Sequence, residues 1–543
     1  MKTFLLTLAL ALSTAIGALA YSFEVDGIYY NINRDTTSVS VTYKKDYLSY
    51  KTYSGDVTIP AEVTSGGKTY PVTAIGVNAF YKCSGLTSVT FPNTIKEIND
   101  DAFYDCTALG QLILPDSIIN IGAWAFNGCK SLTELYIPAS VQEIETAAFS
   151  QCHGLTSIVV DENNAYYDSR ENCNAIIGKE RNNLLAACVN TVIPNSVKWI
   201  DAEAFHGFTW LTEVNLPDSL ERIGQYAFRD CSGLTNINIP STVTYIGSSA
   251  FAGTGLIEAD LPESLQYLGC CVFMDCPEFT RLYIPANVTH LQGGLVCRDQ
   301  KVTSIIVDPR NTHYDSRDNC NAIIETENNT LIEGCNYSTV PEGVRCLGSE
   351  AFFQCELISH IDLPSSLHSI WYGAFQRCYS LTSIHVPEGV VQIEMDAFRD
   401  CKSLTSISLP STLDKAGIDN IGTYCFYGCN NLKDITCYAE TPPQIGPALF
   451  GLFESETYTE ATLYVPQEYI QKYKSADCWR RFTHISPIGD SDGDSELGIS
   501  DVTTLIDLLL NNDQLPYYTD VNDDESTGID DVTSLIDMLL NGN

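Results

Sequence analysis

The sequence predicts a mostly β solenoid built from about 23-residue coils, with a β-rich N-terminal cap and a small α-helical domain of calcium-binding loops at the C-terminus. Three observations predict this fold. One apolar motif recurs at a fixed spacing through most of the chain. Within each copy, apolar residues alternate as they do in a β-strand. After residue 488 the composition changes to an acid-rich segment that contains two similar loop and helix patterns.

Composition limits the class of protein and the class of partner. The chain has 543 residues, of which 44% are hydrophobic, and this content is sufficient for a folded core. Its 30 basic residues against 68 acidic residues give a formal net charge of −38. Such a surface repels phosphate backbones and anionic lipids, so neither nucleic acid nor a membrane surface is an expected partner.

Residues 1–20 have the pattern of a bacterial secretory signal peptide. Lys2 precedes an apolar run from Phe4 to Leu12 that is too short to span a bilayer, and Ala18-Leu19-Ala20 is typical of a cleavage site. No later segment has the length of a membrane span. We therefore expect a secreted or cell-surface protein that is cleaved near Ala20.

A single repeated frame organises residues 75–437. Each copy has an Ala-Phe pair, then Cys three residues after the Phe, Leu at six, apolar residues at nine and eleven, Pro at twelve, and apolar residues at fifteen and eighteen. A single coil cannot bury its apolar side alone, so successive coils must stack and align these positions into interior ladders. The regularly spaced Phe positions are Phe80, Phe103, Phe126, Phe149, Phe205, Phe228, Phe251, Phe352, Phe375 and Phe398.

A longer duplication is superposed on the short repeat. The segment 168–177 returns almost unchanged as 315–324, a shift of 147 residues. In both places the spacing between Phe positions more than doubles, from Phe149 to Phe205 and from Val296 to Phe352. We call these segments the first and the second wide coil and expect both to be irregular.

Cysteine occupies the same slot in ten coils, and this ladder has two interpretations. Parallel Cβ vectors in neighbouring coils stay about 4.8 Å apart, which exceeds the usual Cβ separation in a disulfide. Buried thiols are therefore expected, with stacked disulfides as the alternative. The cysteines in this slot are Cys83, Cys106, Cys129, Cys152, Cys231, Cys276, Cys355, Cys378, Cys401 and Cys429.

A polar strip is predicted on the outward side of the repeats. Strand positions eight and ten after each Phe alternate with the buried positions and therefore point to solvent. Their polar side chains, with few cations, suit hydrogen bonding to a glycan or to a neutral protein surface. The candidate ligand-face residues are Ser88, Thr90, Gln111, Glu134, Tyr136, Glu213, Asn215, Asn236, Asn238, His360, Asp362, Ser383 and His385.

The repeat frame Ala-Phe-x-x-Cys-x-x-Leu-x-x-[Leu/Ile/Val]-x-[Ile/Leu]-Pro resembles the leucine-rich repeats of the BspA-like bacterial surface-antigen family. Residues 21–74, which include the segment 23–30, resemble the β-rich N-terminal cap of that family. Residues 438–488, with the apolar segment 462–466 and Trp479, resemble its closing segment. The resemblance implies a leucine-rich-repeat solenoid and a surface or secreted protein that acts in adhesion, through contact with a host or matrix protein or glycan.

Two acidic loops in residues 489–543 have the ligand spacing of calcium sites. This segment holds 14 acidic residues and no Lys or Arg, and an apolar helical pattern follows each loop. Oxygen ligands at loop positions 1, 3, 5 and 12, with a backbone carbonyl at position 7, suit Ca²⁺. The predicted ligands are Asp490, Asp492, Asp494, Asp501 and the carbonyl of Glu496 for one ion, and Asp520, Asn522, Asp524, Asp531 and the carbonyl of Ser526 for a second.

The two loop and helix units of this short C-terminal segment resemble a type I dockerin. The resemblance implies two bound Ca²⁺ ions as cofactors and docking to a cohesin-type partner module. The sequence departs from the usual loop at position 6, where Ser495 and Glu525 replace the glycine of the sharp turn. We therefore expect both residues to require a positive φ angle and to weaken calcium binding.

No catalytic residue is predicted. The chain has no Gly-x-Ser-x-Gly or His-Glu-x-x-His motif, and Cys173 and Cys320 are expected to be structural parts of the wide coils. The sequence therefore favours an exported, non-enzymatic binding or adhesion protein with a calcium-dependent docking module. The alternative is an accessory component, or an enzyme with a site hidden in the wide coils, of an extracellular polysaccharide-degrading assembly of glycoside hydrolases.

Overall fold

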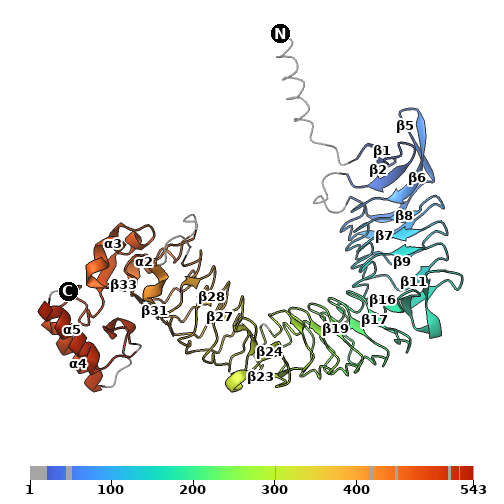
Figure 1. Cartoon of the computed structure of the whole chain (residues 1–543). Coiled ribbons are helices and arrows are strands. Elements are labelled where there is room, and N and C mark those ends of the chain that lie inside the picture. The colour runs from blue at the N-terminus through green and yellow to red at the C-terminus, as the bar shows by residue number, and fades with distance from the viewer. Residues whose placement is uncertain are drawn as a thin grey trace, which may run out of the picture. The chain divides into compact units, whose positions relative to one another are not determined.

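A computed structural model describes residues 21–44, 52–296, 298–299, 301–414, 420–446, 451–511, 515–524 and 526–541. The predicted signal peptide, residues 1–20, lies outside these ranges. The chain divides into two compact units, residues 1–255 and 256–543. Short strands predominate and helices are few (Figure 1). None of the helices in the described part of the chain combines the length and the hydropathy needed to cross a membrane.

The described part of residues 21–74 forms a β-rich start of the first unit. Strands β1 to β3 are antiparallel neighbours, and β3 pairs in parallel with β6. Because β6 and β4 then pair with the first strands of the repeats, they cover strand edges that would otherwise expose unpaired backbone groups. The strands are β1 (Phe23–Val25), β2 (Ile28–Ile32), β3 (Val39–Thr42), β4 (Gly55–Thr58), β5 (Glu62–Ser65) and β6 (Lys68–Ile75).

Two rows of parallel strands run through the repeats of the first unit, and paired residues in each row are one repeat apart. In one row, which we call the outer row, Ser88 pairs with Gln111. In the other, which we call the inner row, Asn120 pairs with Glu143. The outer row contains β7 (Leu86–Thr90), β9 (Gln111–Leu112), β11 (Glu134–Ile137) and β13 (Ser157–Val160). The inner row contains β8 (Glu97–Ile98), β10 (Asn120–Ile121), β12 (Glu143–Ile144), β17 (Trp199–Ile200), β18 (Arg222–Ile223) and β19 (Tyr245–Ile246).

The second unit repeats this arrangement. Its inner row contains β20 (Tyr267–Leu268), β22 (His290–Leu291), β27 (Cys346–Leu347), β28 (Ser369–Ile370) and β30 (Gln392–Ile393). Its outer row contains β21 (Arg281–Ile284), β23 (Ser304–Val307), β29 (Ser383–His385), β31 (Ser406–Leu409), β32 (Asp434–Cys437), β33 (Thr462–Val465) and β34 (His484–Pro487). The last five strands form one parallel sheet. Helices α2 (Thr457–Glu460) and α3 (Ile470–Ser475) lie beside its end.

Each wide coil contains an antiparallel hairpin, as the prediction of irregular coils required. In the first, β14 (Tyr167–Asp168), β15 (Ala175–Gly178) and β16 (Asn183–Ala187) pair in order, and β16 then starts the next run of inner strands. In the second, β24 (Tyr314–Asp315), β25 (Ile323–Glu325) and β26 (Thr330–Glu333) do the same. The two hairpins therefore have the same topology.

The core consists of the predicted ladders. The rings of Phe80 and Phe103 stack with centroids 4.7 Å apart, and Phe103 and Phe126 stack at 5.0 Å. Beside them the ladder cysteines are buried free thiols, and Sγ of Cys106 donates a hydrogen bond to the Phe80 carbonyl at 3.0 Å. Burial raises the pKa of Cys231 to about 12. The ladder cysteines therefore act in the structure as small apolar residues that also bond the backbone of a neighbouring coil.

Candidate functional site

The C-terminal segment forms two similar loop and helix units. Helices α4 (Ile499–Asn511) and α5 (Ile529–Asn541) each have 13 residues, and each follows an acidic loop. Leu505 of α4 packs with Val532 and Leu535 of α5 and with Val521 in a small core. The helical periodicity predicted this packing for most of the apolar residues. Ile506 and Ile536, which belong to the same predicted pattern, are exposed instead and lie outside the small core.

In the first loop, three predicted calcium ligands come together. Asp490, Asp492 and Asp494 each offer a carboxylate oxygen, and these oxygens all lie within 4.8 Å of one another. Asp490 is only 1% exposed, and burial raises its pKa. Its two oxygens accept hydrogen bonds from the N–H groups of Gly493 at 2.9 Å and Ser495 at 3.0 Å.

In the second loop the group consists of Asp520, Asp524 and Asp531, at positions 1, 5 and 12, with ligand oxygens also within 4.8 Å of one another. Asn522 lies beside it, and its Nδ2 donates to Asp524 at 3.1 Å. Hard carboxylate oxygens grouped in this way suit a divalent cation of the Ca²⁺ type, so the donor set of both loops fits the expected ion. The position 7 residues Glu496 and Ser526 are exposed, and the use of their carbonyls stays a prediction.

The position 12 residues of both loops bond the loop backbone. Oδ1 of Asp501 accepts the N–H groups of Ser491 at 2.7 Å and Asp492 at 3.1 Å, and its Oδ2 accepts that of Gly498 at 2.7 Å. Asp531 makes the equivalent three contacts in the second loop. Asp531 also belongs to the group of its loop, whereas the group of the first loop does not include Asp501, whose role as a ligand stays a prediction.

The turn of the first loop has the predicted geometry. Ser495 has φ +70°, which is the left-handed region that the missing glycine would favour. Glu525, its equivalent in the second loop, lies outside the described residues.

Most of the predicted ligand-face residues point to solvent. Thr90, Gln111, Glu134, Tyr136, Glu213, Asn215, Asn236, Asn238, His360 and Asp362 are exposed, and Ser88 is half-buried. Segments 213–215, 236–238 and 360–362 keep the alternation of burial but lie outside the strands. Ser383 and His385 are half-buried, and the ring of Tyr517 lies 5.8 Å from that of His385.

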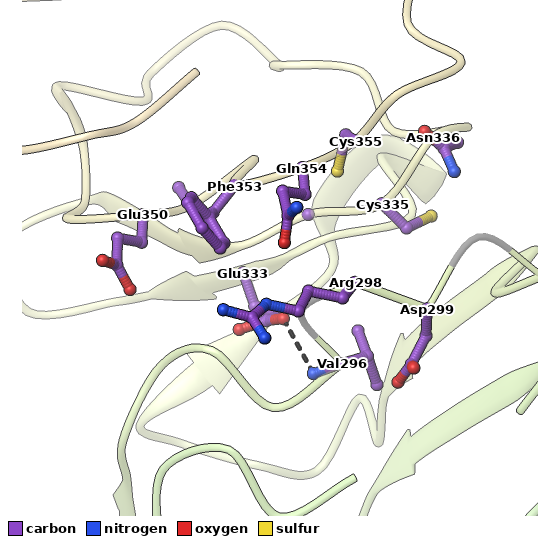
Figure 2. A pocket seen from close by; sticks show the side chains of 12 residues that line it. Val296, Arg298, Asp299, Glu333, Cys335, Asn336, Glu350, Phe353, Gln354 and Cys355 are labelled. Carbon is purple, nitrogen blue, oxygen red and sulfur yellow. Dashed lines mark hydrogen bonds between the residues drawn. The ribbon is translucent and has the colours of Figure 1, made fainter. Parts of the chain in front are cut away.

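Two buried acids in the second wide coil were not predicted as site residues. Asp299 and Glu333 line a small cavity of about 10 Å³, which is at the lower limit of what can hold one water molecule (Figure 2). Glu333 accepts N–H groups from Leu295 at 2.9 Å and Val296 at 3.1 Å. Neither oxygen of Asp299 makes a well-formed hydrogen bond with the described residues. Asp299 occupies the ladder slot of a cysteine, and this break in the repeat was the available signal.

A groove of about 1290 Å³ lies beside the first wide coil, between the edge strand β12 and the hairpin. The hydroxyl of Tyr167 accepts the N–H of Ile144 at 2.8 Å and ties the two sides together. Glu143, Glu145 and Arg181 line the groove. The repeat pattern could not predict this groove, because the groove lies where the pattern is interrupted.

The ladders, the constant register between coils and the strand rows define a leucine-rich-repeat protein. The model of the BspA type leucine-rich repeat region matches residues 70–177, 182–303, 333–451 and 415–473, which is more than half of the chain. The chain belongs to this family, and the family predicted from the repeat frame is confirmed.

Several solved structures are similar. A leucine-rich repeat protein from Bacteroides ovatus is 24% identical, over 77% of this chain and 94% of that chain, with a TM-score of 0.36. A leucine-rich cell surface protein from Faecalibacterium prausnitzii is 22% identical over 78% and 94%, with a TM-score of 0.36. The pneumococcal vaccine antigen PcpA is 17% identical over 86% and 97%, with a TM-score of 0.33. Comparison with curated proteins found no match.

Proposed function

We propose that this chain is an exported binding or adhesion protein. In this proposal residues 1–20 are a signal peptide, the leucine-rich-repeat solenoid carries a ligand face for a protein or glycan, and residues 489–543 are a dockerin-like module that binds two Ca²⁺ ions. Membership of the BspA-type family and the polar strip of exposed outward side chains support the binding role. The non-enzymatic assignment remains part of the proposal.

The paired carboxylate groups carry the calcium assignment. Each loop places three carboxylate oxygens within 4.8 Å of one another in front of a helix, from positions 1, 3 and 5 in the first loop and from positions 1, 5 and 12 in the second. Without a cation, these carboxylates repel one another, so binding a divalent ion should stabilise the loops. Calcium would supply the charge that neutralises them, while the aspartates of each loop, Asp501 and Asp531 included, hold the loop backbone in place.

Exposed apolar residues on α4 and α5 support a docking role. Ile499, Ile506 and Leu510 fall on one side of α4, because a spacing of seven and eleven residues returns to the same helix face. Ile529, Ile536 and Leu540 repeat this stripe on α5, and the outer residues of both stripes are 77–83% exposed. Apolar patches of this kind mark protein interaction sites. A cohesin-type module of an extracellular polysaccharide-degrading assembly is the proposed partner.

Calorimetry on the mature full chain tests the calcium assignment. We expect two sites whose heats disappear in a variant that carries Asp490→Ala and Asp520→Ala. Ser495→Gly should tighten the first site by about tenfold, since relief of a positive φ recovers about 1 to 2 kcal/mol. Gly493→Ala is the matched control, because its φ of +79° adds the same strain in open space and should weaken binding. Absence of calcium heat in the native chain would disprove the assignment.

Two binding assays test the remaining parts of the proposal. Capture by an immobilised cohesin module should require calcium and should be lost with Ile499→Asp and Ile529→Asp. Binding to arrayed glycans and matrix proteins should be lost when Tyr136, Asn215 and Asn238 are replaced by Lys, and circular dichroism should show that this variant remains folded. Unchanged binding by the Lys variant would reject the outward face as the ligand face.

A further inference from the structure

The segment between the two loops lies against the last strands of the repeat region. It contains a short 3-10 helix, η6 (Tyr517–Thr519), and then Asp520, the first residue of the second loop. The Tyr438 hydroxyl, directly after β32, shares its one proton between the carbonyl oxygens of Asp520 at 2.9 Å and Tyr517 at 3.2 Å. A repeat-region side chain therefore holds the backbone at the start of a calcium loop.

Aromatic packing extends this contact. The rings of Tyr464, on β33, and Tyr518 stack with centroids 4.0 Å apart and an interplanar angle of 16°. Tyr438, Tyr464 and Ile488 form a buried cluster against which Tyr518 packs. Under this segment the outward side chains of Ser408 and Thr436 are 1% and 0% exposed, although the equivalent positions elsewhere in the outer row face solvent.

The first loop also contacts the last strands of the repeat region and the segment between the two loops. It begins directly after β34, and the N–H of Asp490 donates to the Pro487 carbonyl at 3.2 Å. The N–H of Gly489 donates to the Tyr518 carbonyl at 2.8 Å, which joins the starts of the two loops. Ser486, on β34, and Ser495, in the loop turn, bring their hydroxyls within 3.0 Å. Both loops are therefore anchored at position 1 on the closing strands.

We propose that the outward face of β31–β34 is the seat of the chain's own calcium module, and that calcium binding and seating of the module are thermodynamically linked. The inference rests on the proposed calcium function. The contacts fix the backbone at position 1 of each loop, so part of the ordering that calcium requires is already present in the seated module. The linkage works in both directions: calcium binds more tightly to the seated module, and bound calcium favours the seated state.

This arrangement divides the outward face into two parts. The strands from β31 onward are occupied by the module, which also reaches His385 on β29 through Tyr517. Ligands of the repeats are therefore left with the earlier outward residues, from Ser88 to Asp362. The apolar stripe residues of α4 and α5 remain exposed in the seated module and are available to a separate partner.

A calcium titration of the mature full chain tests the linkage. The double variant Tyr438→Phe with Tyr464→Ala removes the hydroxyl contacts and the ring stack, and it replaces no predicted calcium ligand. We expect calcium affinity about tenfold weaker than in the native chain, the equivalent of about 1.4 kcal/mol, with the larger loss at the second loop. Tyr337→Phe with Tyr166→Ala makes the same chemical changes at exposed positions and should leave the affinity unchanged.

Hydrogen exchange provides a second measurement. In the native chain, calcium should slow exchange of the β32 and β33 amides, and this effect should be lost in the double variant. The single variant Tyr438→Phe deletes one oxygen and serves if the double variant does not fold. Unchanged calcium affinity together with calcium-independent exchange in β32 and β33 would overturn the linkage. Absence of any calcium binding in the native chain would instead overturn the calcium function on which it rests.

Discussion

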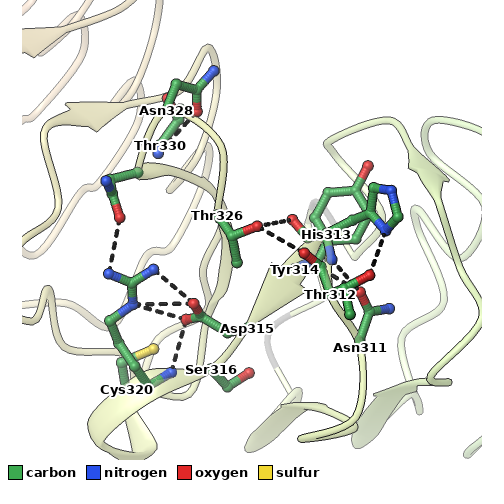
Figure 3. Close-up of polar contacts among 12 residues, drawn as sticks. Asn311, Thr312, His313, Tyr314, Asp315, Ser316, Cys320, Thr326, Asn328 and Thr330 are labelled. Carbon is green, nitrogen blue, oxygen red and sulfur yellow. Dashed lines mark hydrogen bonds and ion pairs between the residues drawn. The ribbon is translucent and has the colours of Figure 1, made fainter.

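The two wide coils share one set of hydrogen bonds. In the first, Nδ2 of Asn164 donates to the carbonyls of Pro138 and Val141, and its Oδ1 accepts the N–H groups of two tyrosines. Asn311 makes the same four contacts in the second, with His313 and Tyr314 as the donors. Figure 3 shows Asn311, His313 and Tyr314 of the second wide coil and, near them, Asp315, which forms an ion pair with Arg317. The residues that the duplication preserved are thus those that shape the hairpin.

The buried slots beside these hairpins differ between the two copies. Cys152 and Ala186 of the first wide coil correspond, at the same shift along the chain, to Asp299 and Glu333 of the second. Burial raises the pKa of Asp299 to about 9 and that of Glu333 to about 7, although the N–H groups that Glu333 accepts oppose the rise there. The second copy has therefore replaced two small core residues with acids that are costly to ionise there.

The surface beside the hairpins differs as well. Glu143, Glu145 and Arg181 line the groove of the first wide coil, and their equivalents after the shift are His290, Gln292 and Asn328. The duplicated fold thus tolerates changes of charge on its surface while its hydrogen-bond network stays constant. The shared hydrogen-bond network therefore maintains the hairpin in both wide coils. The two copies differ in the buried slots beside the hairpin and in the residues at the position of the groove.

The largest expected effect follows from breaking the shared network. Asn311→Ala removes four hydrogen bonds and leaves buried backbone groups without partners, which should cost about 4 kcal/mol of unfolding free energy. Asn164→Ala should cost the same, because its contacts are the same. Urea unfolding measures both, with the exposed Asn163→Ala as the control. A large effect in only one copy would show that the two hairpins are not energetically equivalent.

A smaller effect is expected from restoring the ladder. Asp299→Cys replaces a buried carboxyl with the residue of the first copy, and it should stabilise the chain by about 3 kcal/mol at pH 8. Cys152→Asp is the reverse exchange in the first wide coil and should destabilise by a similar amount. Urea unfolding at constant pH measures both changes.

The stabilisation by Asp299→Cys should depend on pH. Well below pH 4 both the folded and the unfolded chain carry a neutral Asp299, so the native chain has little penalty there. As pH rises from about 4 to 9, the unfolded chain releases the proton while the folded chain retains it, and the native chain loses stability. The gain from Asp299→Cys should therefore grow through this window. A gain that is equal at pH 4 and pH 8 would contradict the raised pKa.

Much of the repeat fold is predictable because one frame is repeated many times. The Phe, Cys, Leu and Ile positions each fall in an aligned ladder, so errors at single residues do not disturb the pattern. The backbone between them is less predictable. Residues two before and two after the ladder Phe adopt positive φ angles, as Asp101 and Asp105 do around Phe103, and they are often not glycine. The stacking of the coils imposes these positive φ angles, and no single residue type in the sequence predicts them.

The calcium loops show the same division. The spacing of acids predicted that carboxylates gather in each loop, and three do so in each: those at positions 1, 3 and 5 in the first loop and at positions 1, 5 and 12 in the second. It did not predict that Asp501 and Asp531 bond the loop backbone, because those contacts depend on the conformation of the folded loop. Nor did it predict the contact of Tyr438 with Asp520, which joins residues 82 positions apart. Such a contact depends on how the module is seated and not on any local pattern.

The smallest expected effect comes from the second acid, and it should have the opposite sign. Glu333→Ala also restores the residue of the first copy, but it removes the acceptor of the Leu295 and Val296 N–H groups. Loss of these hydrogen bonds outweighs relief of the buried carboxyl, so the variant should be destabilised by about 2 kcal/mol at pH 6. Glu333→Gln keeps an amide oxygen as acceptor and should lose less. Stabilisation by Glu333→Ala in urea unfolding would show that both acids only destabilise the second wide coil. Stabilisation by Asp299→Cys together with destabilisation by Glu333→Ala would show that Glu333, unlike Asp299, contributes hydrogen bonds that stabilise its wide coil.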